Sequence, residues 1–423
     1  LTGRPTRGVR ADGGDPDREV YRLLIAEDGI TVHAATPEGA HRALTSLVQL
    51  AVLGDGIVPC CTVEDAPDFA WRGLSLDVVR AFVPLQEIER IIDILSFYKL
   101  NVLHLHLTDN EGWRLEIRSW PRLTDNGAHD ASTDVVRPHY TQSEFRRLVA
   151  YAADRGVTVI PEIDLPGHAT AAISAYPELG RRGAQSPNLD PASPQTWHFV
   201  HDVMTEVAAL SPAPFIHIGG DEAFGMDDAD HAAFVERTMS IVKNLGKRVV
   251  GWQEICRAPV GEEDVVQYWI DFDPGAVGNA ELVSAALVDH PPEVLDMLLD
   301  HFGKAQDDID RMAESRARVV LSPTGHVYLD RPHGDSSTVP EQDALRSRLG
   351  LQVYPPSSLH EIFEWDPRRA IDALDPGLHD GGEGHRLAQL GGGVGAVGAD
   401  HGFGRGRHFS CLLEGGSDII IFT

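Results

Sequence analysis

The sequence predicts an α/β protein, a (β/α)8 (TIM) barrel preceded by part of a small α/β domain. Three observations lead to this prediction. Between Trp71 and about Asp366, short apolar segments alternate with segments of helical periodicity about seven times, which indicates parallel βαβ units. Polar residues stand where the predicted strands end, and barrel enzymes carry their chemistry at that edge. The 423 residues suffice for one such barrel and a smaller domain.

Residues 1–70 are predicted to be part of the small α/β domain. They begin with a polar stretch rich in Gly and Asp, after which two strand-like segments, 21–25 and 30–34, surround Asp28-Gly. An Asp-Gly pair between two such segments is a strong signal for a β-hairpin. The apolar spacing over 40–53 then predicts a helix.

The barrel itself is predicted to span residues 71–370. A Thr-x-x-Glu sequence at Thr141 is typical of the capping box that begins a helix. The expected strands are 74–79, 102–107, 157–163, 215–218, 248–252, 265–269 and 319–322, and the expected helices include 85–98, 141–155, 196–210 and 232–245.

Residues 371–423 depart from this pattern and form an atypical Gly-rich tail. They contain 14 glycines in 53 residues, no Trp or Tyr, and no alternation of strand-like and helix-like segments. Such a composition cannot bury much apolar core. We therefore find no candidate for the last barrel strand in this tail.

Charge and cysteine spacing argue against several classes of protein. With 36 basic and 64 acidic residues, the formal net charge of −28 disfavours binding to nucleic acid or to an anionic membrane. No segment approaches the ~18 consecutive apolar residues of a membrane-spanning helix. The 4 cysteines include no C-x-x-C pair, so neither a disulfide framework nor a zinc ribbon is predicted. No signal peptide is recognised, and since the sequence does not begin with methionine, a secreted and a cytoplasmic location both stay open.

The motif His217-Ile-Gly-Gly-Asp221-Glu222 carries the clearest chemical signal. Consecutive side chains on a strand point to opposite faces, but past the strand end the two glycines let the backbone curve, so that both carboxylates can approach one ligand. Close carboxylates favour one ionised and one protonated group, a division of roles that suits glycoside cleavage. The alternative interpretation is that Asp221 and Glu222 cap a following helix.

The context of this motif resembles the β-N-acetylhexosaminidases, family 20 of the glycoside hydrolases. The resemblance extends from about Tyr21 to Pro367, and its motifs occur in the order and spacing of that family. They are Trp71-Arg-Gly-Leu-Ser-Leu-Asp77-Val-Val-Arg80, His104-Leu-His106-Leu-Thr-Asp109-Asn-Glu-Gly-Trp113-Arg114, Pro161-Glu162-Ile-Asp164-Leu-Pro-Gly-His168, the Asp-Glu motif, Gly251-Trp252-Gln-Glu-Ile, Gln267-Tyr-Trp269 and Tyr328-Leu-Asp330.

The resemblance implies a retaining exo-glycosidase that removes terminal β-linked N-acetylglucosamine or N-acetylgalactosamine. In this family the 2-acetamido oxygen of the sugar is the nucleophile and forms an oxazolinium intermediate, an exception to the scheme of two protein carboxylates. Glu222 matches the general acid/base. Asp221 matches the residue that orients the acetamide N–H and stabilises the charge developing there. Tyr328 matches the hydroxyl that donates to the acetamide oxygen.

The same resemblance implies the sugar-binding residues. Trp252 and Trp269 match walls of an aromatic box around the acetamide group and the sugar ring. Arg80 and Asp330 match residues that hydrogen-bond sugar hydroxyls. Asp109 and His168 match a supporting pair near the acid/base. No cofactor or metal is expected. The expected partners are oligosaccharides or glycoconjugates that contain N-acetylhexosamine, and the oligomeric state is not predicted.

The sequence departs from the family pattern in two places. The usual Asp-Asp-Gln-Gly-Trp run reads Asp109-Asn110-Glu111-Gly112-Trp113. The family's last strand also ends in a Gly-x-x-Ala-x-Leu-Trp-x-Glu type motif, which supplies a further box Trp and a hydroxyl-binding Glu. Nothing in residues 371–423 matches that motif.

Two other functions stay open. His104-x-His106 places two imidazoles on one face of a strand, and with His168, His217 and Asp221 these residues suit a metal-dependent barrel hydrolase. The departures in the tail suit an inactive copy, truncated or frameshifted, that binds sugar weakly or does not fold. An open barrel would leave unpaired strand edges.

Overall fold

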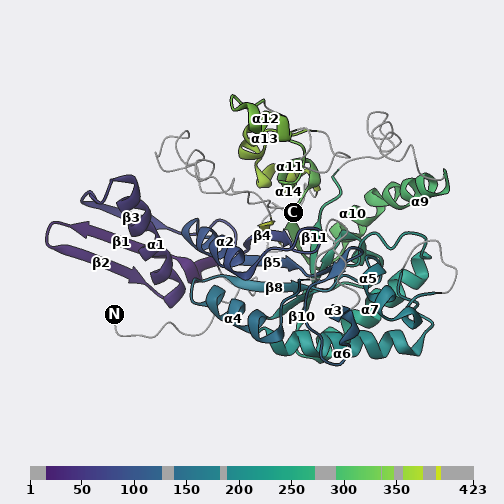
Figure 1. The fold of residues 1–423 in the computed structure, drawn as a ribbon. Coiled ribbons are helices and arrows are strands. Elements are labelled where there is room, and N and C mark those ends of the chain that lie inside the picture. The colour runs from purple at the N-terminus through teal and green to yellow at the C-terminus, as the bar shows by residue number, and fades with distance from the viewer. Residues whose placement is uncertain are drawn as a thin grey trace.

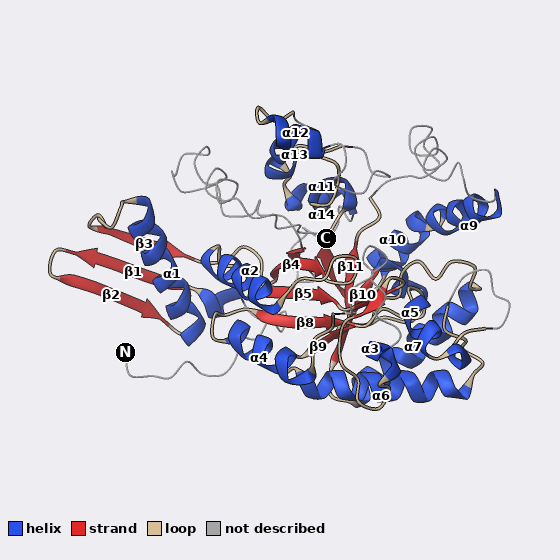
Figure 2. Cartoon of the chain, viewed as in Figure 1, coloured by secondary structure: helices blue, strands red, loops and turns tan. Residues whose placement is uncertain are grey.

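The computed structural model of the chain describes residues 16–125, 138–181, 188–271, 292–334, 336–346, 356–374 and 387–391. A three-stranded antiparallel sheet with one long helix lies beside a parallel barrel (Figure 1). Helices surround the barrel strands, which lie at the centre of the larger body (Figure 2). The N-terminal Gly/Asp-rich stretch and the Gly-rich tail beyond Gly391 lie outside the described residues.

The small N-terminal sheet has the strand order β2-β1-β3. Strands β1 (Tyr21–Ala26) and β2 (Gly29–Ala34) form an antiparallel hairpin, as the Asp28-Gly pair predicts, and β3 (Cys61–Asp65) pairs with the other edge of β1. Helix α1 (Pro37–Leu53) begins at Thr36, whose side chain accepts from the Gly39 N–H.

A buried carboxylate joins this sheet to the barrel. Glu19 is the last residue of the 3-10 helix η1 (Pro16–Glu19), with which the described chain begins. Its Oε2 accepts from Arg42 Nε and Arg72 Nη2, both at 2.6 Å. Asn101 donates to Oε1 of the same carboxylate at 3.2 Å. Because Arg42 lies on α1 and Arg72 begins the first barrel strand, Glu19 ties the two parts together.

The barrel is closed, and its strands pair in the order β10-β11-β12-β13-β4-β5-β8-β9. All of the strand pairs within it are parallel. The strands are β4 (Arg72–Asp77), β5 (Val102–His106), β8 (Thr158–Glu162), β9 (Phe215–His217), β10 (Arg248–Trp252), β11 (Val265–Tyr268), β12 (Arg318–Leu321) and β13 (Leu387–Gly391).

Seven of these strands are the ones that the apolar segments predict. The predicted helices are confirmed as α2 (Leu85–Phe97), α4 (Gln142–Ala153), α6 (Pro194–Leu210) and α7 (Asp228–Asn244). Thr141 caps α4 in the predicted capping box, since its side chain accepts from the Glu144 N–H while Glu144 accepts from the Thr141 N–H.

The eighth strand corrects the interpretation of the tail. Sequence analysis finds no strand candidate after residue 370, whereas Leu387–Gly391 lies between β12 and β4. Its pairing is short, with two residue pairs to each neighbour and a register shift against β12. Strand pairing uses backbone groups alone, so a five-residue segment can complete the barrel without the family's Trp or Glu, and neither residue occurs in Leu-Ala-Gln-Leu-Gly.

Shorter elements complete the described chain. At the carboxyl end of the barrel, β6 (Thr108–Asp109) and β7 (Gly112–Trp113) form a small hairpin. No helix in the described ranges is long and apolar enough to cross a membrane. The remaining elements are α3 (Arg122–Asp125), α5 (Thr170–Ala175), η2 (Pro177–Leu179), η3 (Gln253–Arg257), α9 (Pro292–Gly303), α10 (Ala305–Glu314), α11 (Thr324–Val327), α12 (Pro340–Arg346), α13 (Leu359–Glu364) and α14 (Pro367–Leu374).

Side chains on the barrel strands alternate between two apolar clusters. Val102 and Ile160 belong to a small cluster inside the barrel, whereas Leu103 and Val159, their neighbours in the chain, pack in the large cluster with the surrounding helices. This alternation follows from the pleat of a β-strand. It sends every second residue into the barrel, and the last inward residues of the strands therefore meet at its carboxyl end.

Candidate active site

Asp221 and Glu222 lie in a tight turn after β9. Gly219 and Gly220 have φ of 68° and 98°, in the left-handed region that favours glycine, and Glu222 has φ of 45°. A Cβ on Gly219 would collide with the carboxylate of Asp164, so the turn also needs glycine for space. The next helix, α7, is capped by Asp227, whose side chain accepts from the Ala229 N–H. Asp221 and Glu222 therefore do not cap it, and the helix-cap interpretation is wrong.

His168 lies between the two carboxylates of the motif and Asp109. Its Nε2 is 3.4 Å from Asp221 Oδ2 and 3.3 Å from Glu222 Oε2, and its Nδ1 is 2.9 Å from Asp109 Oδ1. Burial alone would lower the pKa of His168, but Asp109, Asp164 and Asp221 raise it well above its ordinary value. The imidazole is therefore a cation that faces the Asp-Glu pair.

Burial raises the pKa of Asp221 to about 6, while the nearby His168 cation opposes that rise. Burial and the neighbouring Asp221 also raise the pKa of Asp164 well above its usual range. Among the described residues, Asp221 Oδ1 and Asp164 Oδ2 are buried oxygens without a hydrogen-bond partner. Asp221 therefore carries an unused acceptor inside the site.

An aromatic cluster stands next to the turn. Trp252, Trp269 and Tyr328 are at most 8% exposed and pack together with Phe302. The two indole rings are 6.3 Å apart at an angle of 69°. The backbone N–H of Trp252 donates to the Gly219 carbonyl at 2.9 Å, which joins the cluster to the Asp221 turn.

Both indole N–H groups are held by buried carboxylates. Trp252 donates to Glu162 Oε1 at 2.8 Å, and Trp269 donates to Glu254 Oε2 at 3.0 Å. Glu162 and Glu254 are each 0% exposed. These contacts fix the planes of the two rings.

Arg80 and Asp330 lie on another side of the site. Arg80 is half exposed and contacts three carboxylates, Asp77 at 2.8 Å, Asp109 at 2.6 Å and Glu111 at 3.2 Å. Asp330 is buried, and its pKa is raised to about 7, mainly by this burial, with a further contribution from Asp77 and an opposing one from Arg80. The structure thus gathers the predicted residues Asp109, Asp221 and Glu222 around the imidazole of His168, and Arg80 is joined to them through Asp109.

Asn110 and Glu111, the two residues that depart from the family pattern between Asp109 and Trp113, both make contacts near the site. Glu111 supplies one of the carboxylates around Arg80. Asn110 Oδ1 accepts from the Thr170 hydroxyl at 2.6 Å and from its N–H at 3.2 Å, which ties the β6–β7 hairpin to α5. Both substitutions are therefore accommodated without loss of Asp109 from the site.

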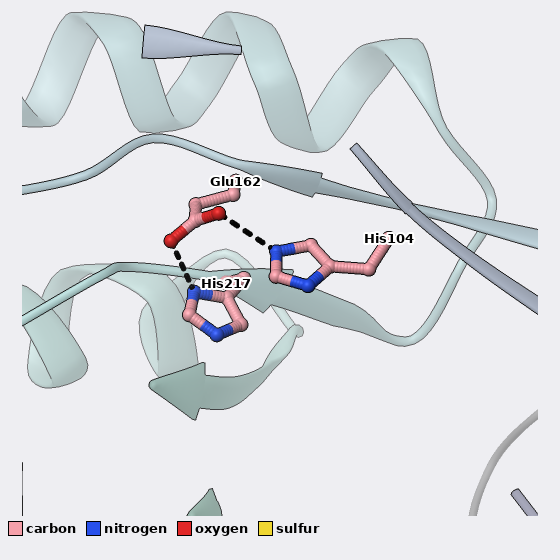
Figure 3. Close-up of side chains that lie close together, drawn as sticks. All are labelled: His104, Glu162 and His217. Atoms are coloured by element: carbon pink, nitrogen blue, oxygen red, sulfur yellow. Dashed lines mark hydrogen bonds and ion pairs between the residues drawn. The ribbon is translucent and has the colours of Figure 1, made fainter. Parts of the chain in front are cut away.

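The sequence places Glu162 in the family motif Pro161-Glu162-Ile-Asp164-Leu-Pro-Gly-His168 but predicts no role for it. Glu162 Oε2 accepts from His104 Nε2 at 2.8 Å and from His106 Nδ1 at 2.6 Å, and Oε1 lies 3.1 Å from His217 Nδ1. Figure 3 shows this carboxylate between the His104 and His217 rings. The sequence signal was present, because His104, Glu162 and His217 occupy inward positions of three adjacent strands.

Three groups of side chains are close enough to hold a metal ion among the described residues. They are His104–Glu162–His217, His106–Asp109–Asp164 and Asp164–His168–Asp221, with ligand atoms within 4.8 Å of one another. In the first group, burial lowers the pKa of His217 to about 4, so this imidazole is neutral, and Glu162 already contacts both histidines directly.

Comparison with known proteins supports the family resemblance. The family model "Glycosyl hydrolase family 20, catalytic domain" matches residues 69–384, and "Glycosyl hydrolase family 20, domain 2" matches residues 4–66. A β-N-acetylhexosaminidase of Cellulomonas fimi is 35% identical over 403 residues, which cover 89% of this chain and 73% of that protein. A β-hexosaminidase of Vibrio furnissii is 36% identical over 384 residues, covering 79% of this chain and 61% of that protein.

Solved structures give the same result. A mutant Streptomyces plicatus β-hexosaminidase in complex with the product GlcNAc is 33% identical with a TM-score of 0.68, covering 90% of this chain and 71% of the other. The family 20 β-N-acetylhexosaminidase of Streptomyces coelicolor A3(2) is 32% identical with a TM-score of 0.68, covering 90% and 72%. The chain belongs to glycosyl hydrolase family 20 and is a glycoside hydrolase of the β-N-acetylhexosaminidase type.

Proposed function

We propose that this chain removes terminal β-linked N-acetylglucosamine or N-acetylgalactosamine from oligosaccharides or glycoconjugates, with retention of configuration and with the 2-acetamido oxygen as nucleophile. The observation that carries the proposal is the unused acceptor Asp221 Oδ1 beside the aromatic cluster. A buried carboxylate oxygen next to an apolar wall suits the N–H of an acetamide group, whose methyl group would meet the wall.

The reaction follows from the two carboxylates. The acetamide oxygen attacks the anomeric carbon while the bond from this carbon to the leaving oxygen breaks, and Glu222 donates a proton to that oxygen. The positive charge that develops on the acetamide nitrogen is stabilised by ionised Asp221. In the second half, Glu222 takes a proton from water, which attacks the anomeric carbon and opens the oxazolinium ring. Two inversions at this carbon give net retention.

The remaining residues are assigned to binding and orientation. Trp252 and Trp269 enclose the acetamide group and limit the access of water to the intermediate. Tyr328 donates to the acetamide oxygen, and Arg80 and Asp330 bind sugar hydroxyls. Asp109 and His168 support Glu222, since His168 contacts both groups.

The anomer of the first product tests this proposal. Hydrolysis of a nitrophenyl β-N-acetylglucosaminide is followed by proton NMR before mutarotation mixes the anomers. The β-anomer is expected first. The α-anomer as the first product contradicts a retaining, substrate-assisted reaction.

An inactive copy is the second candidate, and the sequence of β13 favours it. Leu-Ala-Gln-Leu-Gly supplies neither the Trp nor the Glu that the family motif provides at the last strand. The chain should be compared with a variant in which this segment carries a Leu-Trp-x-Glu motif. Cleavage by the variant alone would identify the given chain as inactive, whereas cleavage by both would show that the two contacts are dispensable.

Metal-dependent hydrolysis is the third candidate, supported by the groups of ligand atoms around Asp164. Substrate assistance predicts that activity survives dialysis against a chelator. Loss of activity with EDTA and its recovery with one divalent cation would favour the metal mechanism.

A further inference from the structure

Glu162 lies beneath the site, at the end of β8 and between the neighbouring strands β5 and β9. It is 0% exposed, and its two carboxylate oxygens accept hydrogen bonds from two different parts of the site. Oε1 accepts from the Trp252 indole, and Oε2 accepts from His104 and His106. Figure 3 shows Glu162 placed between the rings from the adjacent strands.

From Glu162 a continuous chain of contacts reaches the acid/base. His106 donates to Glu162 through Nδ1 at 2.6 Å and to Asp109 Oδ2 through Nε2 at 2.7 Å. Burial alone would lower the pKa of His106. Both of its ring nitrogens face carboxylates, however, and these raise the pKa well above its ordinary value. Asp109 then contacts His168, and His168 lies 3.3 Å from Glu222.

Only a carboxylate can accept hydrogen bonds from Trp252 on one side and from the two histidines on the other. Its two oxygens both accept, whereas the amide of glutamine has one accepting oxygen and one donating NH2 group. With glutamine at this position, either Trp252 or the two histidines would face a donor. A buried donor without an acceptor is costly, so one of these side chains would turn.

We propose that Glu162 is a positioning residue, which holds the Trp252 ring and the His106–Asp109–His168 chain in one mutual arrangement. Neither contact involves substrate, so Glu162 acts through the residues that it orients. This inference rests on the proposed function, because that function assigns Trp252 to the acetamide group and Glu222 to the acid.

The test compares Glu162→Gln with Asp264→Asn in the full chain. Asp264 is an equally buried carboxylate that precedes β11, at the opposite end of the barrel, where it accepts from Lys243 Nζ at 2.9 Å. Both variants replace a buried carboxylate by an amide, so a general loss of stability affects both. Each is measured per unit of folded protein, with kcat and KM determined separately.

Two readouts are expected to separate the variants. Loss of hydrogen bonds at charged groups predicts a kcat roughly 10- to 100-fold lower in Glu162→Gln, and a change below about twofold in Asp264→Asn. The indole N–H signal of Trp252 in a proton–nitrogen NMR spectrum, assigned by its loss in Trp252→Phe, should shift in Glu162→Gln and stay unchanged in Asp264→Asn. If Glu162→Gln does not fold, Glu162→Asp replaces it, because it keeps the charge but withdraws the carboxylate.

An unchanged indole signal, or a kcat within twofold of the wild type, overturns the positioning role. Failure of the proposed function looks different, because the wild-type chain would then cleave no N-acetylhexosaminide. In that case the indole signal alone decides whether Glu162 holds Trp252.

Discussion

The two ends of the barrel interior are filled in opposite ways. At the amino end of the strands, apolar side chains form one layer in which no residue is more than 4% exposed, namely Trp71, Val102, Ile160, Phe215, Val250, Val265 and Val320. At the carboxyl end, five of these strands present side chains that are also buried but make hydrogen bonds, namely His104, His106, Glu162, His217, Trp252 and Gln267.

Strand β8 contains the contrast within three residues. Ile160 and Glu162 face the same side of the strand, and both are 0% exposed. Burial of the Ile160 side chain stabilises the fold by removing apolar surface from water. Burial of the Glu162 carboxylate is tolerated because His104, His106 and Trp252 donate hydrogen bonds to it. We therefore expect substitutions at the amino end to change the free energy of unfolding, and substitutions at the carboxyl end to change turnover.

The largest effect is expected for Glu222→Gln. Loss of the general acid should lower kcat/KM for substrates with poor leaving groups by roughly 10²–10⁴-fold, but should affect nitrophenyl glycosides far less, because those leave without a proton. Steady-state kinetics on an alkyl and a nitrophenyl β-N-acetylglucosaminide test this within a single variant. Equal losses on both substrates would mean that Glu222 does not protonate the leaving group.

Asp221→Asn is expected to have the next largest effect. Turnover should fall by roughly 10²–10³-fold while substrate binding changes much less, since the proposed mechanism assigns Asp221 to charge that develops during the reaction. A cyclic thiazoline analogue of the oxazolinium ion should bind the parent tightly and lose affinity in the variant. A covalent adduct on Asp221 after treatment with a 2-fluoro sugar, seen by mass spectrometry, would instead make this residue the nucleophile.

The sequence predicts most of the barrel strands, but it predicts the hydrogen-bonded carboxyl end of the barrel only in part. Seven barrel strands follow from apolar periodicity, and the Asp-Glu turn follows from the two glycines that precede it. The role of Glu162 does not, because its partners come from three other strands, β5, β9 and β10, whose register relative to β8 is set only when the barrel closes. The strand at Leu387–Gly391 was missed because it lies among glycines and carries too few apolar residues for a periodicity signal.

The pH dependence of turnover should reveal the ionised form of Asp221. Its pKa of about 6 means that the carboxylate takes up a proton as the pH falls below 6, and the charge that the proposed mechanism uses to stabilise the acetamide cation disappears. On the acid side kcat should therefore fall about tenfold per pH unit, as expected for one proton. Asp330, with a pKa of about 7, titrates nearby. The Asp330→Asn variant should still show the fall in kcat near pH 6. If the fall disappears in this variant, the titrating group is Asp330 and not Asp221.

The smallest effect on activity is expected at the amino end of the barrel, in Ile160→Ala. Removing this buried side chain from the apolar layer should lower the free energy of unfolding by roughly 2–5 kcal/mol, because a cavity remains where the methyl groups packed. Ile160→Val, which removes less, should cost about 0.5–1.5 kcal/mol. Urea denaturation measures both values, and kcat/KM per folded molecule should stay within about twofold of the parent. Ile160 and Glu162 share one strand and one face, so this pair isolates the position along the barrel axis. A tenfold loss of kcat/KM in folded Ile160→Ala would show that the apolar layer determines the position of Glu162 along the barrel axis. The division between a stabilising end and a catalytic end would then no longer hold.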